Sequence, residues 1–293
     1  MEDPRRSPEP PRPSAADIAA TIALLGDDRA AIHGVARDRL MRWGDVVLVQ
    51  LREAAEADHV RTRARSRALL RAFEVRDLLR RFAGLRLGKG GRSSASTLLD
   101  GAVLLSNMVR TFVPDTLELA SRLRLEAARL KKQFTARSLP TCARLLGERL
   151  HAELGLQGSG ASVLEIDHVM IDRVLQARTG IPVSLSLIYL LVARWAGLSA
   201  VGVALPDHFL VRLHGVRPLL VDPFHGGRTV TKSDCSRYLR ASGHDQVQEH
   251  LRDLTDREVL IHYLRCLKRA ASYRAAPDAE QTLGRALALL ETP

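Results

Sequence analysis

The sequence predicts an α+β protein that is mostly helical, with a small antiparallel sheet, and three observations support this. Apolar residues recur at helical spacing over most of residues 14–196 and again from Lys232 to the end. Between these stretches, "LSAVGVAL", "HFLVRL" and "PLLVDPF" alternate with the period of strands and are separated by turns. A few short strands between helical segments predict a small sheet packed against helices.

The N-terminal part is expected to be a proline-rich tail followed by helices. Residues 1–13 hold five prolines among charged residues, a composition typical of a disordered tail. Ser14 can cap a first helix, and residues 14–83 then alternate helices and short turns in a rhythm that resembles a HEAT-like repeat. Only about one and a half units are present, whereas a free-standing solenoid needs about three. We therefore expect a HEAT-like helical cap.

The rest of the chain divides into three predicted parts. Residues 84–96, "GLRLGKGGRSSAS", predict a flexible basic linker, because glycine, serine and charged residues replace the apolar pattern. Residues 97–231 hold several helical segments and all three predicted strands, and we expect them to form the core domain. Residues 232–293 return to a helical pattern and predict a helical C-terminal segment.

The net charge of +11 raises the question of a nucleic-acid partner. The arginines are mixed with acidic residues along helical segments, aromatic residues make up only 4% of the chain, and no nucleic-acid-binding motif appears. A solvated arginine-rich surface is the simpler interpretation, and a nucleic-acid partner is the alternative.

The cysteines and the hydropathy of the sequence argue against several classes of protein. Cys142, Cys235 and Cys266 lie far apart without a CxxC motif, which argues against a zinc site, a disulfide framework and a dithiol redox centre. No run of 18 apolar residues and no secretory signal appears. We expect a cytoplasmic protein with no membrane association, no cofactor and no metal. The oligomeric state stays open.

Three polar residues follow one another in an order that suggests a site. Ser184 follows Pro182, which starts a helix, so it is expected in the first turn, where free N–H groups favour negative charge. His208 begins a predicted strand and Asp222 ends the next one. If these strands pair, Asp222 can accept a hydrogen bond from the ring of His208 and fix its tautomer.

This arrangement resembles the transglutaminase-like superfamily, and in particular its SirB-type branch with a second transglutaminase core domain. The resemblance rests on "VLQARTGIPVSLSLIYLLVARWAGLSAVGVALPDHFLVRL" and "LLVDPFHGG". It implies a papain-related core, in which a central helix packs on an antiparallel sheet. It also implies that His208 is the catalytic-type histidine and Asp222 its orienting acid. The C-terminal helices resemble, more loosely, a tetratricopeptide-like ending.

The sequence departs from the superfamily at three places. The helix start carries Ser184, or Ser186 if the register shifts, where classical members have a nucleophilic cysteine. Asp207 replaces a glycine before the histidine. The stretch "HVMID", residues 168–172, lacks two asparagines of the branch. A serine hydroxyl needs a base to become a nucleophile, so these departures weaken the case for catalysis.

Two functions therefore remain open. The first is a catalytically silent transglutaminase-like domain that acts by binding a protein or peptide, in regulation for example. The second is an acyl-transfer or amide-hydrolysing enzyme, with Ser184 as nucleophile, His208 as general base and Asp222 as its orienter.

Overall fold

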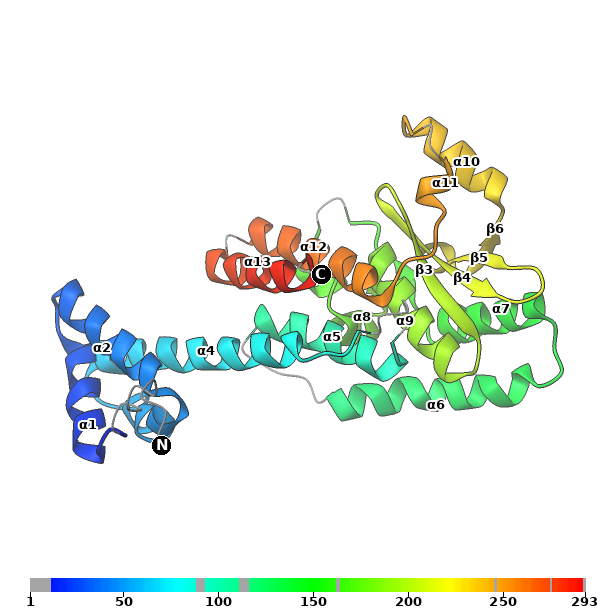
Figure 1. Ribbon diagram of the computed structural model, residues 1–293. Helices are drawn as coiled ribbons and strands as arrows, with labels where there is room; N and C mark the ends of the chain where they lie inside the picture. Colours follow the sequence, from blue (N-terminus) through cyan, green and yellow to red (C-terminus); the bar gives the residue numbers. More distant parts are fainter. Residues whose placement is uncertain are drawn as a thin grey trace, which may run out of the picture. The chain divides into compact units, whose positions relative to one another are not determined.

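The computed structural model of the protein describes residues 12–87, 93–110, 116–161, 164–244, 247–274 and 276–291. It divides into two compact units, residues 1–78 and residues 79–293 (Figure 1). Almost all of the predicted N-terminal tail lies outside the described residues, as do residues 88–92 of the predicted linker. The protein is α+β and mostly helical, as the sequence predicts.

The first unit is helical throughout its described part. Its core gathers apolar side chains from every helix, including Ile22, Leu40, Leu51 and Phe73. The helices are α1 (Ala15–Ala23), α2 (Ala30–Trp43), α3 (Leu48–Ala54) and α4 (Val60–Ala83), with short 3₁₀ turns at Leu24–Gly26 and Gly44–Val47; the last turns of α4 belong to the second unit.

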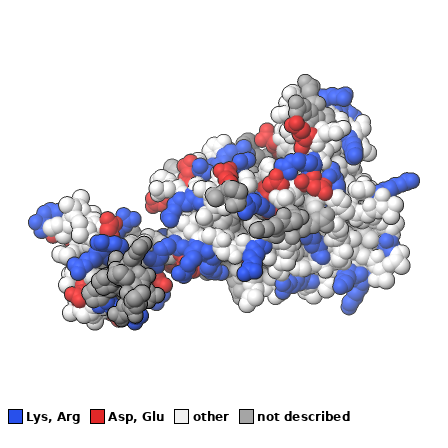
Figure 2. All heavy atoms as spheres, in the orientation of Figure 1, with Lys and Arg blue, Asp and Glu red and all other residues white. Residues whose placement is uncertain are grey.

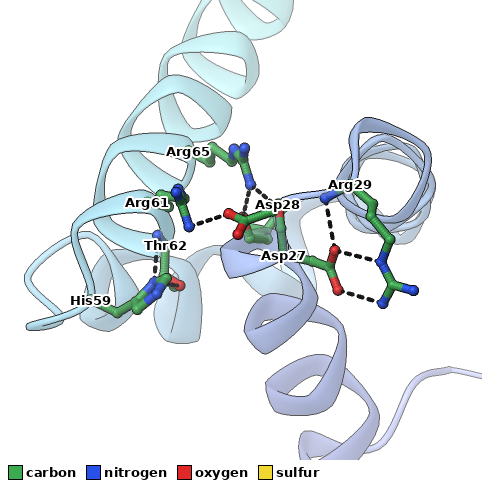
Figure 3. Close-up of polar contacts among 8 residues, drawn as sticks. Asp27, Asp28, Arg29, His59, Arg61, Thr62 and Arg65 are labelled. Carbon is green, nitrogen blue, oxygen red and sulfur yellow. Dashed lines mark hydrogen bonds and ion pairs between the residues drawn. The ribbon is translucent and has the colours of Figure 1, made fainter.

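Arg65 of α4 bonds to the backbone of the turn between α1 and α2 (Figure 3). Arg65 donates hydrogen bonds to the backbone carbonyls of Leu25 and Asp27, at 2.6 and 2.7 Å. Arg61 forms an ion pair with Asp28 in the same turn. These bonds satisfy carbonyl groups that the end of a helix leaves without an intrahelical partner. Several arginines of α4 are therefore engaged in structural contacts.

The second unit contains the remaining helices and both sheets. Ser94 caps α5, its hydroxyl accepting a hydrogen bond from the backbone of Thr97, so the last residues of the predicted linker already belong to a helix. The helices are α5 (Ala95–Met108), α6 (Thr116–Phe134), α7 (Leu139–Gly147), α8 (Ile171–Ala177), α9 (Pro182–Trp195), α10 (Lys232–Ala241), α11 (Val247–His250), α12 (Asp256–Tyr273) and α13 (Pro277–Glu291).

A four-stranded antiparallel sheet is the main β-structure. Its strands lie in the order β3 (Ser199–Leu205), β4 (His208–His214), β5 (Leu219–Asp222) and β6 (Arg228–Val230). The first three are the predicted strands, whereas β6 is too short to show a period in the sequence. Two further strands of two residues each, β1 (Gln157–Gly158) and β2 (Thr179–Gly180), pair in parallel.

Helix α9 lies at the centre of this unit. Its residues are buried from Val183 through Ala193, on all sides of the helix. It packs against β3 and β4 of the sheet and against α5, α6 and α12 (Figure 1). A helix that is apolar all round must be enclosed by other elements. The central helix on an antiparallel sheet, which the resemblance implies, is thus present.

Candidate functional site

The start of α9 carries the two serines that the sequence offers as nucleophiles. Pro182 is the first residue of the helix, which places Ser184 in its first turn. Ser184 is fully buried, and its hydroxyl donates a 2.7 Å hydrogen bond to the backbone carbonyl of Val169. Ser186 is also fully buried and donates to the carbonyl of Phe209 at 3.1 Å. Both hydroxyl protons are engaged by backbone carbonyls.

His208 and Asp222 come together through strand pairing. Strands β4 and β5 are antiparallel neighbours, with Val211 opposite Val221. The ring Nε2 of His208 donates to Oδ1 of Asp222 at 3.1 Å. Burial raises the pKa of the Asp222 carboxyl, but the hydrogen bond and charge of His208, and then those of His225, outweigh burial and leave the pKa below its ordinary value. The carboxylate is therefore the form that accepts these bonds.

The residue before the histidine occupies a special backbone position. Leu205 and His208 are opposite each other in β3 and β4, so Pro206 and Asp207 form a two-residue hairpin turn. Asp207 has a φ of 51°, in the left-handed region that glycine occupies without strain and that aspartate tolerates better than most residues. Asp207 can therefore occupy the turn that presents His208.

A second histidine joins the pair, and our sequence analysis did not identify it. After β5 ends, a 3₁₀ turn at Pro223–His225 brings His225 back toward Asp222. Its Nδ1 donates to Oδ2 of Asp222 at 2.7 Å, and its backbone N–H donates to Oδ1 at 3.2 Å. The signal available in the sequence was the spacing of three residues in "DPFH", which a single helical turn converts into proximity.

A cavity of about 220 Å³ lies beside His208 and the start of α9. Its wall includes a face of α12 that the sequence did not connect to the site: His262, Cys266 and Arg269. Their spacing of four and three residues is that of one helical face. The remaining lining residues are Leu164, Ile181, Pro182, Val183, Leu205, Asp207, Phe209 and Arg265.

The geometry supplies a base and its orienting acid, but it does not present Ser184 as a nucleophile. The His208–Asp222 pair has the arrangement of a general base and its orienting acid. Ser184, in contrast, donates its hydroxyl hydrogen bond to the backbone carbonyl of Val169 and has no exposed surface. Burial first, and then the nearby Arg265, lower the pKa of His262, so its ring is neutral at neutral pH. Burial, only partly offset by Arg269, raises the pKa of the Cys266 thiol, which disfavours the reactive thiolate.

Comparison with known families agrees with this architecture. The model of the family described as "Transglutaminase-like superfamily" matches residues 117–265, just over half of the chain. The chain belongs to the transglutaminase-like superfamily. The matched region contains α9, the four-stranded sheet and just over half of α12, so the superfamily domain holds His208, Asp222 and His225 together.

Several curated proteins are similar over shorter stretches. A "UPF0162 protein" of Xylella fastidiosa (strain 9a5c) is 35% identical over 94 residues, 31% of this chain and 33% of the relative. A "UPF0162 protein" of Vibrio cholerae is 36% identical over 78 residues, 26% of this chain and 29% of the relative. Human "F-box only protein 21" is 32% identical over 95 residues, 29% of this chain and 15% of the relative. The chain thus matches a third or less of these relatives' length. No solved structure matches it.

Proposed function

We propose that this transglutaminase-like domain is catalytically silent and acts by binding a segment of another protein. The observation that carries the proposal is the environment of Ser184, whose fully buried hydroxyl donates to the carbonyl of Val169. A nucleophile must reach both its base and the substrate. A hydroxyl that is enclosed and bonded to the backbone serves the fold, as many buried polar groups do.

The cavity beside His208 supports binding of a peptide. Pro182, Val183 and Phe209 offer apolar contacts, and Arg269 is an exposed cation, whereas the exposed Arg265 pairs with Glu291. Asp207 is the one acidic residue among the described lining residues. This combination suits an extended segment that places an apolar side chain in the cavity and a carboxylate on Arg269.

Peptide binding is tested by reversing one charge at the rim. We expect Arg269→Glu to weaken binding of fluorescent peptides that combine glutamates with an apolar residue, by about tenfold or more, because attraction becomes repulsion. The matched control is Lys268→Glu, the same charge change at a neighbouring residue of α12 that does not line the cavity. Fluorescence anisotropy measures both affinities. Equal weakening by the two variants, or no binding of any such peptide, contradicts the proposal.

The alternative function, a Ser-His-Asp acyl transferase or hydrolase, is favoured by one observation, the 3.1 Å hydrogen bond between His208 and Asp222. It predicts that a fluorophosphonate probe labels Ser184 and that His208→Ala abolishes the labelling. Because Ser184 is buried and bonded to Val169, we expect no labelling of Ser184 by mass spectrometry. Labelling of Ser184 that depends on His208 would establish the enzyme and reject the silent domain.

Nucleic acid remains the weaker partner. On the face shown in Figure 2, lysine and arginine side chains are scattered over both units, with acidic side chains among them. Arg110 and Arg194 form largely buried ion pairs with Asp172 and Asp256.

No helix of the described residues is long and apolar enough to cross a membrane.

A further inference from the structure

The sequence led us to expect no metal, but from the structure we propose that His208, Asp222 and His225 bind a divalent transition-metal ion, with zinc as the ion of best fit. Each residue offers one ligand atom, and the three atoms lie within 4.8 Å of one another. Two imidazole nitrogens and one carboxylate oxygen form a donor set that zinc and its neighbours in the first transition series accept. This site does not depend on peptide binding.

The side chains of the three ligands differ in how far they are exposed to solvent. Asp222 is buried, with 3% of its surface exposed, and His208 is held at the start of β4. The side chain of His225, by contrast, is 51% exposed on a short turn. In a tetrahedral zinc site, bonds of about 2.1 Å place ligand atoms about 3.4 Å apart. Rotation of the half-exposed His225 side chain can supply the small adjustment that this requires.

Space for the ion and for water lies next to the ligands. The three residues line a second cavity of about 130 Å³, together with Leu205, Leu210, Arg228, Val230, Asp234, Cys235 and Tyr238. A water molecule occupies about 30 Å³, so the cavity can hold the water that completes a coordination shell of three protein ligands.

Binding needs no redox step and no net loss of protons from neutral imidazoles. The nitrogens that now donate to Asp222 are Nε2 of His208 and Nδ1 of His225. To ligate a metal, each ring carries its proton on its other nitrogen, and the carboxylate exchanges two N–H donors for the cation. The guanidinium of Arg228, 3.8 Å from the Asp222 carboxylate and 63% exposed, is the one lysine or arginine group among the described residues that line this cavity, and the metal would displace it.

The test is a titration of the full chain with zinc chloride by isothermal calorimetry. We expect one ion per chain with a Kd of about 10 µM or tighter. His225→Ala removes a half-exposed ligand without disturbing the core, and should weaken binding by about tenfold or more. Arg228→Gln should tighten it about threefold, because a competing positive charge is lost. Zinc should raise the melting temperature of the native protein and not that of His225→Ala.

The matched control is His214→Ala. His214 also donates to a carboxylate, that of Asp253 at 2.8 Å, but belongs to no three-residue set of possible metal ligands among the described residues. This variant should bind zinc as the native protein does. An absence of zinc binding, or binding that His214→Ala weakens and His225→Ala leaves unchanged, overturns the proposal. Neither result bears on the peptide test, which uses Arg269 and contains no metal.

Discussion

Replacing Asp256 by alanine is expected to lower the free energy of unfolding by about 3–5 kcal/mol, the largest effect of any single polar residue we consider. Asp256 is almost completely buried at the start of α12. Its carboxylate receives two hydrogen bonds from Arg194 of α9, at 2.8 and 3.0 Å. The backbone and hydroxyl of Ser93 donate to the same carboxylate at 2.7 and 2.6 Å. Removing it leaves the guanidinium of Arg194 buried without its partner.

Urea denaturation measures this loss, and Glu148→Ala is the control. Glu148 pairs with Arg144 one helical turn away, and both side chains are about half exposed. Such exposed pairs contribute about 0.3–0.5 kcal/mol. If Asp256→Ala costs no more than Glu148→Ala, the buried pair is not what joins α12 to α9.

Replacing Gly227 by alanine is expected to lower the free energy of unfolding by about 3 kcal/mol, because backbone strain and a steric overlap add. Gly227 has a φ of 73°, in the left-handed region that residues with a Cβ rarely adopt. An added Cβ would lie 2.5 Å from the buried hydroxyl of Tyr189 and 2.9 Å from the Cα of Gly147. The backbone N–H of Gly227 donates to the carbonyl of Asp222 at 2.8 Å, so the turn that carries His225 would have to move.

Gly243→Ala is the control, because it imposes the backbone strain without the steric overlap. Gly243 has a φ of 79°, and a Cβ at that position would meet no atom within 4 Å. Gly243→Ala should therefore lower the free energy of unfolding by only about 1 kcal/mol. Thermal and urea denaturation compare the two variants. Equal losses of stability in the two variants would show that a Cβ at residue 227 does not overlap Tyr189.

The sequence alone predicted the elements that carry the site, because their signals are local. Pro182 and the apolar run after it predict the central helix, and Gly197, with a φ of 95°, follows its end. The alternation around His208 and before Asp222 predicts two strands joined by a short connection, and such strands usually pair. The pairing brought His208 and Asp222 within hydrogen-bond distance, as the order of the residues suggested.

Only the tertiary structure decided what those residues can do. The position of Ser184 in a first turn follows from Pro182, but the direction of its hydroxyl depends on Val169, fifteen residues earlier in the chain. His225 joins Asp222 because a 3₁₀ turn reverses the chain, and α12 reaches the cavity because it packs on α9. Periodicity fixes which face of an element is apolar, whereas contacts between distant elements fix which polar groups meet. The membership of the site therefore depends on packing, which no local pattern encodes.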